Sequence, residues 1–400
     1  MTEKVRILFV GFANVVHTQE WMDLLAGQDE FDVRLYAFPV PFESAFNSLA
    51  WQFPTYSLHQ PRDDKPAKVH WLVPRHKLFG YPLRFLYKRY NLNLHWLRRI
   101  VRRWRPHIIH SLAFDFGTPM VGKALEGLDP AQRPRWVIST WGTDINWGVH
   151  LPPKRQMLET YLQACDGYFG DCLRDIRLAR ECGLDAGKVA FEAAMPATGG
   201  LDLGRITAGE MDPAARRNIL VPKAYDNMYN KTLPLLEALK MCEPLLADYT
   251  IHMLRVSSDV KVAVQLLPAS LRRKIVMHDM LAHDEVLAMM RSSRIVMAPS
   301  LTDGTPLAML EAMASGALPI MSPIESIQEW IEDGKNGLLA HALYPNLQAE
   351  ALTRALQDDD LVRSAAIQNR KLVEQRANRA HIKPQVLDYY RRLGKQGQNG

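Results

Sequence analysis

The sequence predicts an α/β protein with two domains, each a parallel sheet covered by helices. The chain has 400 residues, which is long enough for two hydrophobic cores. Short apolar, β-branched runs alternate with helical stretches, and this alternation is typical of parallel sheets. A glycine-rich stretch at 196–217 separates two sets of such runs and is the best linker candidate. We therefore expect Rossmann-like domains over 1–197 and 198–378.

The strands expected in chain order indicate where ligands bind. They are residues 5–12, 32–38, 107–112, 135–141, 165–170, 188–193, 218–222, 249–255, 274–278, 294–299, 317–321 and 337–340. In open parallel sheets, ligands bind beyond the carboxyl ends of the strands. Two facing sheets would put that edge on a cleft between the domains. Residues with a chemical role are therefore expected directly after strands.

Composition excludes several classes of protein. Apolar residues make up 47% and charged residues 23%, as in ordinary soluble globular proteins. The 4 cysteines lack the spacing of a zinc site, so we expect reduced thiols. The N-terminal apolar run is short and indicates a strand rather than a signal peptide. No run approaches the roughly 18 apolar residues of a membrane-spanning helix. These features predict a cytoplasmic protein, or one that rests on a membrane surface.

The stretch SLTDGTPLAMLEAMASGALPI, residues 300–320, predicts an anion site at a helix start. Thr305 can cap the helix, and Pro306 suits its first position because an N–H is not needed there. Gly316 is expected to end the helix. Free N–H groups and the positive end of the dipole favour a phosphate at the helix start. Gly304 would let that ligand approach the backbone closely.

Two carboxylates in the same stretch have candidate ligands. Glu311 stands in a helix that is apolar on all sides, where a lone carboxylate needs a partner. It lies about 7.5 Å along the axis from Pro306. A nucleotide bound at the helix start would reach it, and it could accept from two ribose hydroxyls. Asp303 could accept from sugar hydroxyls. The alternative is that Glu311 belongs to a structural ion pair and Asp303 to a turn.

This stretch resembles the donor-site segment of family 4 glycosyltransferases, with its two acids separated by seven residues and its LEAMA.G.P sequence. Asp303 stands where the family usually has Glu, and Glu311 matches the second acid. NILVPKAYDNMYNKTLPLLEAL resembles the family's strand, basic residue, loop, basic residue, helix unit. Lys223 follows that strand, and Lys231 stands at or just before the helix start, with Asn230 or Thr232 as cap. The resemblance implies that both lysines bind a diphosphate; the alternative is two solvated lysines.

The N-terminal half carries weaker matches. Gly11 would let the backbone approach the cleft, and His17 lies in a segment similar to the family's HT..W. RPHIIHSL resembles the PDIIH segment and places His110 at a strand end. STWGTDI resembles the HGTD loop, with Trp141 in place of His, and places Asp144 near the acceptor. The alternatives are helix-capping roles for His17 and Asp144.

The resemblance implies a GT-B fold, in which 1–197 binds the acceptor, a helix over 380–393 returns to that domain, and 198–378 binds the nucleotide sugar. It also implies transfer from a nucleotide-diphosphate sugar to an acceptor hydroxyl with retention of configuration, without metal or cofactor. DDD at 358–360 is then a helix-start turn rather than a metal site. The implied catalytic residues are Lys223, Lys231, Asp303, Asp144 and His17; the implied donor contacts are Gly11, Gly304, Thr305, Pro306, Leu307, Glu311 and His110.

The segment at 75–105 contains ten Lys or Arg, no acid, and many aromatic residues. Such an amphipathic stretch suits an anionic membrane surface, here the cytoplasmic face. Nucleic-acid binding and a solvated helix beside the core are the alternatives. The proposed interfacial aromatic residues are Tyr87, Tyr90 and Trp96, and the proposed membrane-surface residues are Arg98, Arg99, Arg102 and Arg103.

Two rival functions stay open at this point. One is a nucleotide-sugar epimerase or a phosphorylase on the same fold. The other is a membrane-bound scaffold that binds a nucleotide sugar without turnover. The acceptor can be lipid-linked or a saccharide, in the synthesis of a glycolipid, polysaccharide or other glycoconjugate. The residues do not identify the base, the sugar or the linkage.

Overall fold

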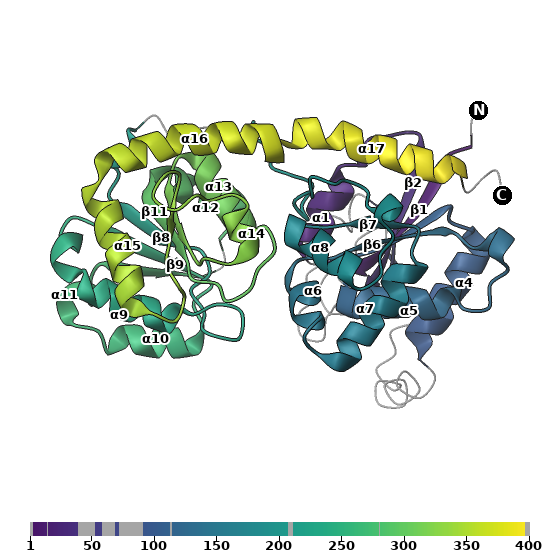
Figure 1. Ribbon diagram of the computed structural model, residues 1–400, viewed down its shortest axis with the longest axis horizontal. Helices are drawn as coiled ribbons and strands as arrows, with labels where there is room; N and C mark the ends of the chain where they lie inside the picture. Colours follow the sequence, from purple (N-terminus) through teal and green to yellow (C-terminus); the bar gives the residue numbers. More distant parts are fainter. Residues whose placement is uncertain are drawn as a thin grey trace. The chain divides into compact units, whose positions relative to one another are not determined.

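The computed structural model describes residues 3–13, 15–38, 53–57, 69–71, 91–112, 114–206, 211–279 and 281–396. The chain divides into two compact units, and each has its own parallel sheet (Figure 1). Unit 1 comprises Met1–Gly199 with His381–Gly400, and unit 2 comprises Gly200–Ala380. The sequence predicted a division between 197 and 198. Within the described ranges, no helix is long and apolar enough to cross a membrane.

Unit 1 is built on a seven-stranded parallel sheet in the order β4-β3-β2-β1-β5-β6-β7. Its strands are β1 Val5–Phe12, β2 Phe31–Phe38, β3 Thr55–Ser57, β4 Val69–Trp71, β5 Ile108–Ser111, β6 Arg135–Ser139 and β7 Gly167–Phe169. Its helices are α1 Val16–Asp23, α4 Leu92–Trp104, α5 Phe114–Leu125, α6 Thr143–Gly148, α7 Pro152–Ala164 and α8 Leu173–Glu181. Helix α17, Arg379–Gln396, contributes Val386, Tyr390 and Leu393 to the core of this unit.

Unit 2 is built on a six-stranded parallel sheet in the order β10-β9-β8-β11-β12-β13, the strand order of a Rossmann fold. Its strands are β8 Asn218–Val221, β9 Thr250–Leu254, β10 Ile275–His278, β11 Ser293–Ala298, β12 Leu318–Met321 and β13 Leu338–Leu339. Its helices are α9 Thr232–Met241, α10 Ser258–Gln265, α11 Ala269–Arg272, α12 His283–Ser292, α13 Leu307–Ser315, α14 Glu325–Gln328, α15 Pro345–Gln357 and α16 Asp359–Ala377.

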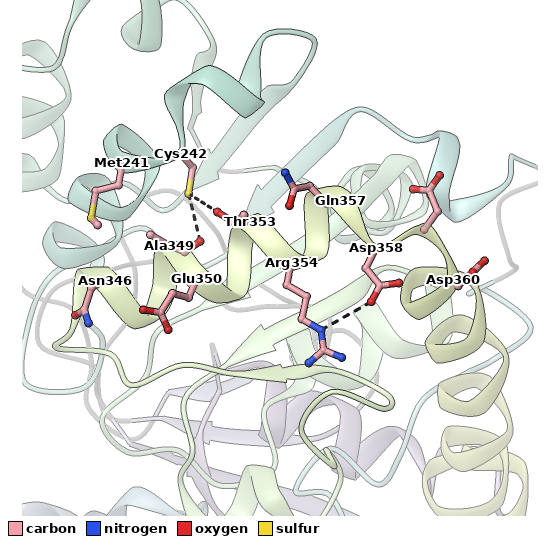
Figure 2. A pocket seen from close by; sticks show the side chains of 11 residues that line it. Met241, Cys242, Asn346, Ala349, Glu350, Thr353, Arg354, Gln357, Asp358 and Asp360 are labelled. Atoms are coloured by element: carbon pink, nitrogen blue, oxygen red, sulfur yellow. Dashed lines mark hydrogen bonds and ion pairs between the residues drawn. The ribbon is translucent and has the colours of Figure 1, made fainter.

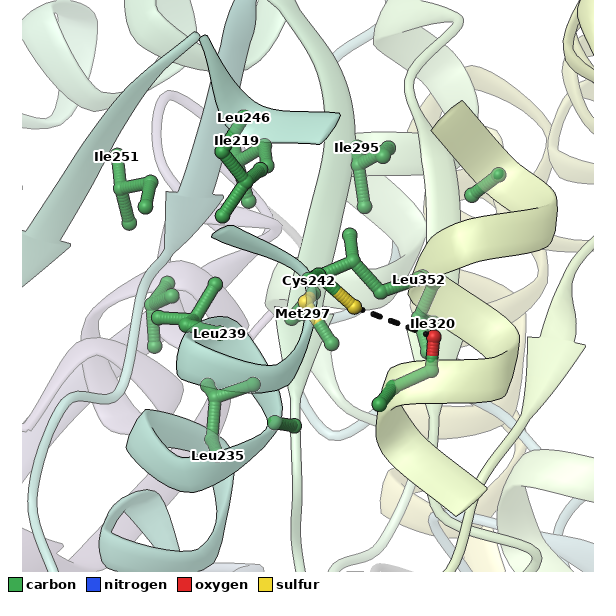
Figure 3. Packing of buried hydrophobic residues seen from close by; sticks show 14 of the residues in the cluster. Ile219, Leu235, Leu239, Cys242, Leu246, Ile251, Ile295, Met297, Ile320 and Leu352 are labelled. Carbon is green, nitrogen blue, oxygen red and sulfur yellow. Dashed lines mark hydrogen bonds between the residues drawn. The ribbon is translucent and has the colours of Figure 1, made fainter. Parts of the chain in front are cut away.

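Alternate side chains of the strands in unit 2 enter two separate cores. In β11, Ile295 and Met297 join the cluster that contains residues of α9 and α15, which Figure 3 shows. Val296 and Ala298 join a second cluster with residues of α12 and α13. Because side chains alternate along a strand, a sheet with helices on both faces needs apolar residues at every position. This explains why the strand reads as a continuous apolar run.

Three differences from the predicted strands have local causes. The strand expected at 188–193 is wrong: Ala186–Lys188 is a 3-10 turn, and only a single bridge joins Val189 to Tyr168. Glu192 then turns outward to pair with Arg180. Strands β3 and β4 were not predicted, because each has only 3 residues and lacks an apolar run. The acidic turn at 358–360 is confirmed as a helix start, since Asp358 accepts the Leu361 N–H at 2.9 Å.

Candidate functional site

The best-formed polar site lies where the strand order of unit 2 reverses, between β8 and β11. This switch point is where open parallel sheets bind ligands. Lys223 follows β8, Asp303 follows β11, and the Lys223 Nζ lies 2.5 Å from the Asp303 Oδ2. Burial lowers the pKa of Lys223, but the Asp303 carboxylate outweighs it and the net change is upward. Lys223 therefore stays cationic at neutral pH.

Hydrogen bonds hold the loop between the two lysines in place. The Asn230 Nδ2 donates to the carbonyls of Lys223 at 2.7 Å and Tyr225 at 3.1 Å. The Thr232 hydroxyl donates to the Tyr225 carbonyl at 2.9 Å. The Lys231 N–H donates to the Pro299 carbonyl at 2.9 Å, so this loop is also tied to the segment after β11. Both lysines therefore project from a loop whose backbone is fixed by hydrogen bonds.

Lys231 stands at the start of α9 and pairs with Asp226. The Lys231 Nζ lies 3.1 Å from one oxygen of Asp226, whose other oxygen accepts the Leu233 N–H at 2.9 Å. The predicted cap by Asn230 or Thr232 is wrong, because both side chains turn back to loop carbonyls. Asp226 caps the helix instead, and the carboxylate offsets the clash between Lys231 and the helix dipole.

Helix α13 begins one residue later than predicted. Pro306 is its N-cap residue and Leu307 its first residue, so Thr305 is not the N-cap residue that the sequence predicted. Gly316 ends the helix with φ 79°, as predicted. The loop before it is fixed, because the Asp303 Oδ1 accepts the Gly304 N–H at 3.2 Å and its carbonyl accepts the Ser326 hydroxyl at 3.0 Å. Thr305, Pro306 and Gly304 are buried and Leu307 is half-buried.

Glu311 has an internal partner that the sequence did not indicate. Its side chain is 5% exposed, and its Oε1 lies 2.6 Å from the Nε2 of His283, the first residue of α12. The lone carboxylate in an apolar helix is thus paired, as the structural alternative required. His283 is 41% exposed on its side chain, so the pair reaches the surface. No periodic pattern links residues 28 positions apart, which is why sequence reasoning missed His283.

The corresponding switch point of unit 1 lies between β1 and β5. Gly11 is packed internally: a Cβ there would lie 3.1 Å from the Leu112 Cβ and 3.5 Å from the Thr18 hydroxyl. This close approach of β1 and Leu112 explains the glycine without a ligand. His17, in the first turn of α1, has its ring 5.2 Å from the ring of Trp141. The structure thus brings together two residues of the predicted acceptor loops.

Asp144 organises two loops at the carboxyl edge of unit 1. One oxygen accepts the N–H of Trp141 at 2.9 Å and of Ile145 at 3.0 Å, and the other accepts the Phe114 N–H at 3.1 Å. Burial raises the pKa of Asp144 to about 7, and the Asp175 carboxylate adds to the rise. Every one of these donors is backbone, so Asp144 holds the two loops together, although the N-cap residue of α6 is Gly142 rather than Asp144.

His110 does not reach a ligand surface, so the predicted donor contact is not supported. The side chain is completely buried. Its Nδ1 lies 2.6 Å from the Tyr390 hydroxyl and its Nε2 lies 2.6 Å from the Ser139 hydroxyl. Burial lowers the pKa of His110 to about 3, so the ring stays neutral. His110 ties α17 to the sheet of unit 1.

Helix α4 has the two faces that its pattern predicts. Leu97, Ile100 and Val101 are buried, whereas Arg99, Arg102 and Arg103 are exposed. Arg98 differs from the prediction: it is half-buried and donates to the Lys123 carbonyl at 2.6 Å and 3.2 Å. Trp96 packs partly against the core rather than projecting outward. Tyr87 and Tyr90 lie outside the described residues.

A surface hollow of about 850 Å³ lies elsewhere in unit 2 (Figure 2). It is lined by residues from the end of α9, by α15 and by the start of α16, and no predicted site residue lines it. Met241 ends α9 and Lys231 precedes it, so the hollow is roughly 15 Å along the helix from the lysine site. Cys242 donates within this hollow to the Ala349 carbonyl at 3.4 Å. The hollow is therefore separate from the switch point.

In the part of the chain that the structure describes, no group of three or more metal-ligating side chains is placed to hold a metal ion.

Comparisons with known proteins connect this geometry to a family. Residues 228–358 match the sequence model of the glycosyl transferases group 1. The similarity to this family is thus shown for that segment of the chain. The match contains Lys231, Asp303 and Glu311 and lies in unit 2. The resemblance to glycosyltransferases that the sequence motifs carried is thereby confirmed.

Relatives agree with the group 1 match. An α-maltose-1-phosphate synthase from Mycolicibacterium smegmatis is 26% identical over 145 residues, 35% of this chain. The match spans 38% of that relative's length. Sucrose-phosphate synthase from Thermosynechococcus elongatus has a structure with TM-score 0.72 and 16% identity, over 98% of this chain and 99% of that one. HepE from Anabaena, in complex with UDP and glucose, has a structure with TM-score 0.69 and 14% identity, over 96% of this chain and 98% of that one. The predicted GT-B fold is confirmed.

Proposed function

We propose that this protein transfers a sugar from a nucleotide-diphosphate donor to an acceptor hydroxyl, with retention of configuration. The observation that carries the proposal lies at the switch point of the unit that contains the group 1 segment: Lys223 pairs with Asp303, and the Lys231 backbone is hydrogen-bonded to the segment after β11. These residues come from two loops that are hydrogen-bonded to each other. Cations held by a fixed backbone can stabilise the negative charge that grows on the leaving group during the reaction.

The lysines would stabilise the diphosphate as its bond to the sugar breaks. Each is already oriented, Lys223 by Asp303 and Lys231 by Asp226, so little reorganisation is needed during the reaction. A bound diphosphate competes with these carboxylates for the ammonium groups. For retention, a phosphate oxygen of the leaving group accepts the proton of the acceptor hydroxyl. The protein then contributes position and charge rather than a nucleophile.

Glu311 remains the proposed ribose contact. His283 engages its Oε1, so His283 orients the carboxylate and leaves its Oε2 for ribose hydroxyls. Asp303 has a more restricted role than the sequence suggested. Its two oxygens bond Lys223 and the Gly304 N–H, so a sugar hydroxyl would share an oxygen with one of them.

The acceptor is assigned to unit 1, where His17 and Trp141 lie together beside the Asp144 loop. A lipid-linked or saccharide acceptor is proposed. One relative and one structural neighbour are named as synthases of phosphorylated sugars, so phosphorylated saccharides belong in the same panel. The neighbour structure with UDP and glucose makes UDP-glucose the first donor to test.

Peripheral attachment to an anionic membrane is proposed for α4. Arg99, Arg102 and Arg103 are exposed, and no carboxylate of the described residues forms an ion pair with them. Each contributes about 1 kcal/mol near an anionic leaflet. The proposed place of action is the cytoplasmic face of the membrane.

Turnover with a panel of donors tests the proposed function. UDP-, GDP- and ADP-sugars would be incubated with saccharide, phosphorylated and lipid-linked acceptors, and the product anomer would be assigned by NMR. We expect acceptor-dependent release of one nucleoside diphosphate and a product with the donor's configuration. Sugar isomerisation without acceptor would support an epimerase, and inorganic phosphate as the acceptor a phosphorylase. Binding without turnover across the panel would support a scaffold.

A further inference from the structure

Arg255 occupies an unusual backbone position at the ligand edge of unit 2. It follows β9, the neighbour of β8, and has φ 54°. A residue with a side chain rarely adopts this left-handed conformation. Such strained positions persist where surrounding contacts impose them and are common at functional sites. Arg255 therefore needs an explanation that an ordinary surface arginine does not.

Two backbone hydrogen bonds place Arg255 next to Lys223. Ala224, which directly follows Lys223, donates to the Leu254 carbonyl at 2.9 Å. The Ala224 carbonyl in turn accepts the Ser257 N–H at 3.1 Å. The segment between Leu254 and Ser257 is thus held at both ends to the residue after the first lysine. Its position does not depend on the arginine side chain.

The charge of Arg255 is unfavourable where it stands. It precedes Ser257, the N-cap of α10, where the helix dipole repels a cation. Its charge also opposes that of Lys223 and lowers the pKa of the lysine. The side chain is exposed, and it has no hydrogen bond or ion pair with any residue that the structure describes. The two unfavourable interactions, with the helix dipole and with Lys223, are therefore not offset by any partner among the described residues.

Arg105 shows that left-handed arginines can have a simple cause. It has φ 50° and is the C-cap of α4, where both a left-handed residue and a cation suit the helix end. Arg255 has the same conformation at the opposite kind of helix end. The explanation that accounts for Arg105 therefore does not apply to Arg255.

The charge of the lysine site shows what Arg255 adds. Lys223 is paired with Asp303 and Lys231 with Asp226, so these four side chains carry no net charge together. A diphosphate has at least two negative charges and would meet two neutralised cations. Arg255 brings an unpaired positive charge beside them, and its guanidinium can form two parallel hydrogen bonds with a phosphate.

We propose that Arg255 is a third cation of this site and binds the diphosphate of the donor directly. This inference rests on the proposed function. The bound diphosphate supplies the counter-charge that Arg255 lacks. It also accounts for an arginine in a conformation that favours glycine. Arg255 belongs to the group that contacts substrate, next to Lys223 and Lys231.

Calorimetry with the full chain tests this inference. UDP, GDP and ADP would be titrated against the wild type and the variants Arg255→Ala, Arg255→Lys and Arg255→Gly, with the matching nucleosides as probes without phosphate. Arg273→Ala is the matched control, since Arg273 is an exposed arginine two residues before β10, at the opposite edge of the same sheet. Melting temperatures would be measured for every variant.

We expect Arg255→Ala and Arg255→Gly to weaken binding of the preferred diphosphate by about tenfold or more, and Arg255→Lys by less. Nucleoside binding and the control variant should be unchanged, and the salt dependence of diphosphate binding should decrease. Arg255→Gly should melt no lower than wild type, because glycine tolerates the left-handed backbone. Equal diphosphate affinity in wild type and Arg255→Ala would overturn the inference alone. A wild type that binds none of the diphosphates would overturn the proposed function as well.

Discussion

The switch points of the two sheets use their polar residues differently. In unit 2, Lys223 and Asp303 meet as ions that are each about a quarter exposed, at 25% and 22% of their side chains. In unit 1, His110 at the end of β5 is neutral, fully buried and bonded to Tyr390 and Ser139. Asp144 in the same unit holds backbone N–H groups. The same switch point therefore holds a partly exposed ion pair in one unit and buried, internally bonded side chains in the other.

The largest effect should come from the lysines of unit 2. We expect Lys223→Ala and Lys231→Ala each to reduce kcat/KM by about 10²–10³-fold, because each removes a cation from the leaving diphosphate. The melting temperature should change little. Lys240→Ala, on the exposed end of the same helix as Lys231, is the control. Kinetics and melting would be measured on the same preparations. A variant that melts far lower but keeps its turnover would assign the lysine to bracing.

His110 gives the opposite expectation. His110→Phe keeps the ring volume but leaves the Ser139 hydroxyl and one bond of the Tyr390 hydroxyl unsatisfied. We expect the free energy of unfolding to fall by about 2–4 kcal/mol, measured by urea denaturation. Ser139→Ala removes a single bond and should cost less. Nucleotide affinity of unit 2 should persist in both variants. A His110→Phe variant that lost nucleotide affinity but kept normal stability would support a donor-binding role for His110.

Glu311 tests whether a buried pair can also be a ligand contact. We expect Glu311→Ala to weaken binding of the donor by about 1.5–3 kcal/mol, since a charged acceptor is lost. Calorimetry with the preferred nucleotide would measure it, and Glu332→Gln at an exposed ion pair is the control. Unchanged affinity would leave Glu311 as only the partner of His283.

The buried imidazole also predicts a pH dependence. The pKa of His110 is near 3 in the folded protein and near its usual 6.5 when unfolded. Below the usual value the unfolded state binds the extra proton, so stability falls as pH falls. The loss is at most about 1.4 kcal/mol per pH unit. Urea denaturation between pH 7 and pH 5 should show a steeper decline for wild type than for His110→Phe. Equal slopes would show that other groups dominate.

The smallest effect per residue concerns α4. Changing Arg99, Arg102 and Arg103 to Glu should abolish cosedimentation with anionic vesicles, at about 1 kcal/mol for each arginine lost. Binding of the wild type should also weaken with salt, because the Debye length shortens. Arg98 stays unchanged, since it holds the Lys123 carbonyl. Wild type that ignores anionic vesicles at low salt would exclude the membrane surface. Tight binding of single-stranded nucleic acid at low salt would instead support the nucleic-acid alternative for this helix.

Local pattern determined much of this protein. The apolar runs set the central strands because helices cover both faces of each sheet, so that consecutive residues such as Ile295, Val296 and Met297 are all buried. The left-handed C-cap at Gly316 and the turn at 358–360 depend on neighbouring residues alone. The family motif singled out Lys223, Lys231 and Glu311, and the structure places the lysines after β8 and directly before α9, and Glu311 within α13. Strands β3 and β4 escaped detection because 3 residues carry too little pattern.

Only the tertiary structure decided the partner of each polar side chain. His283 reaches Glu311 across 28 positions, and Tyr390 reaches His110 across 280, distances over which no periodicity acts. Arg255 stands beside Lys223 because Ala224 bonds both flanks of its segment. The motif assigned His110 to a ligand because it ends a strand. Burial made it a brace instead, since an enclosed imidazole loses its solvation and must bond within the protein.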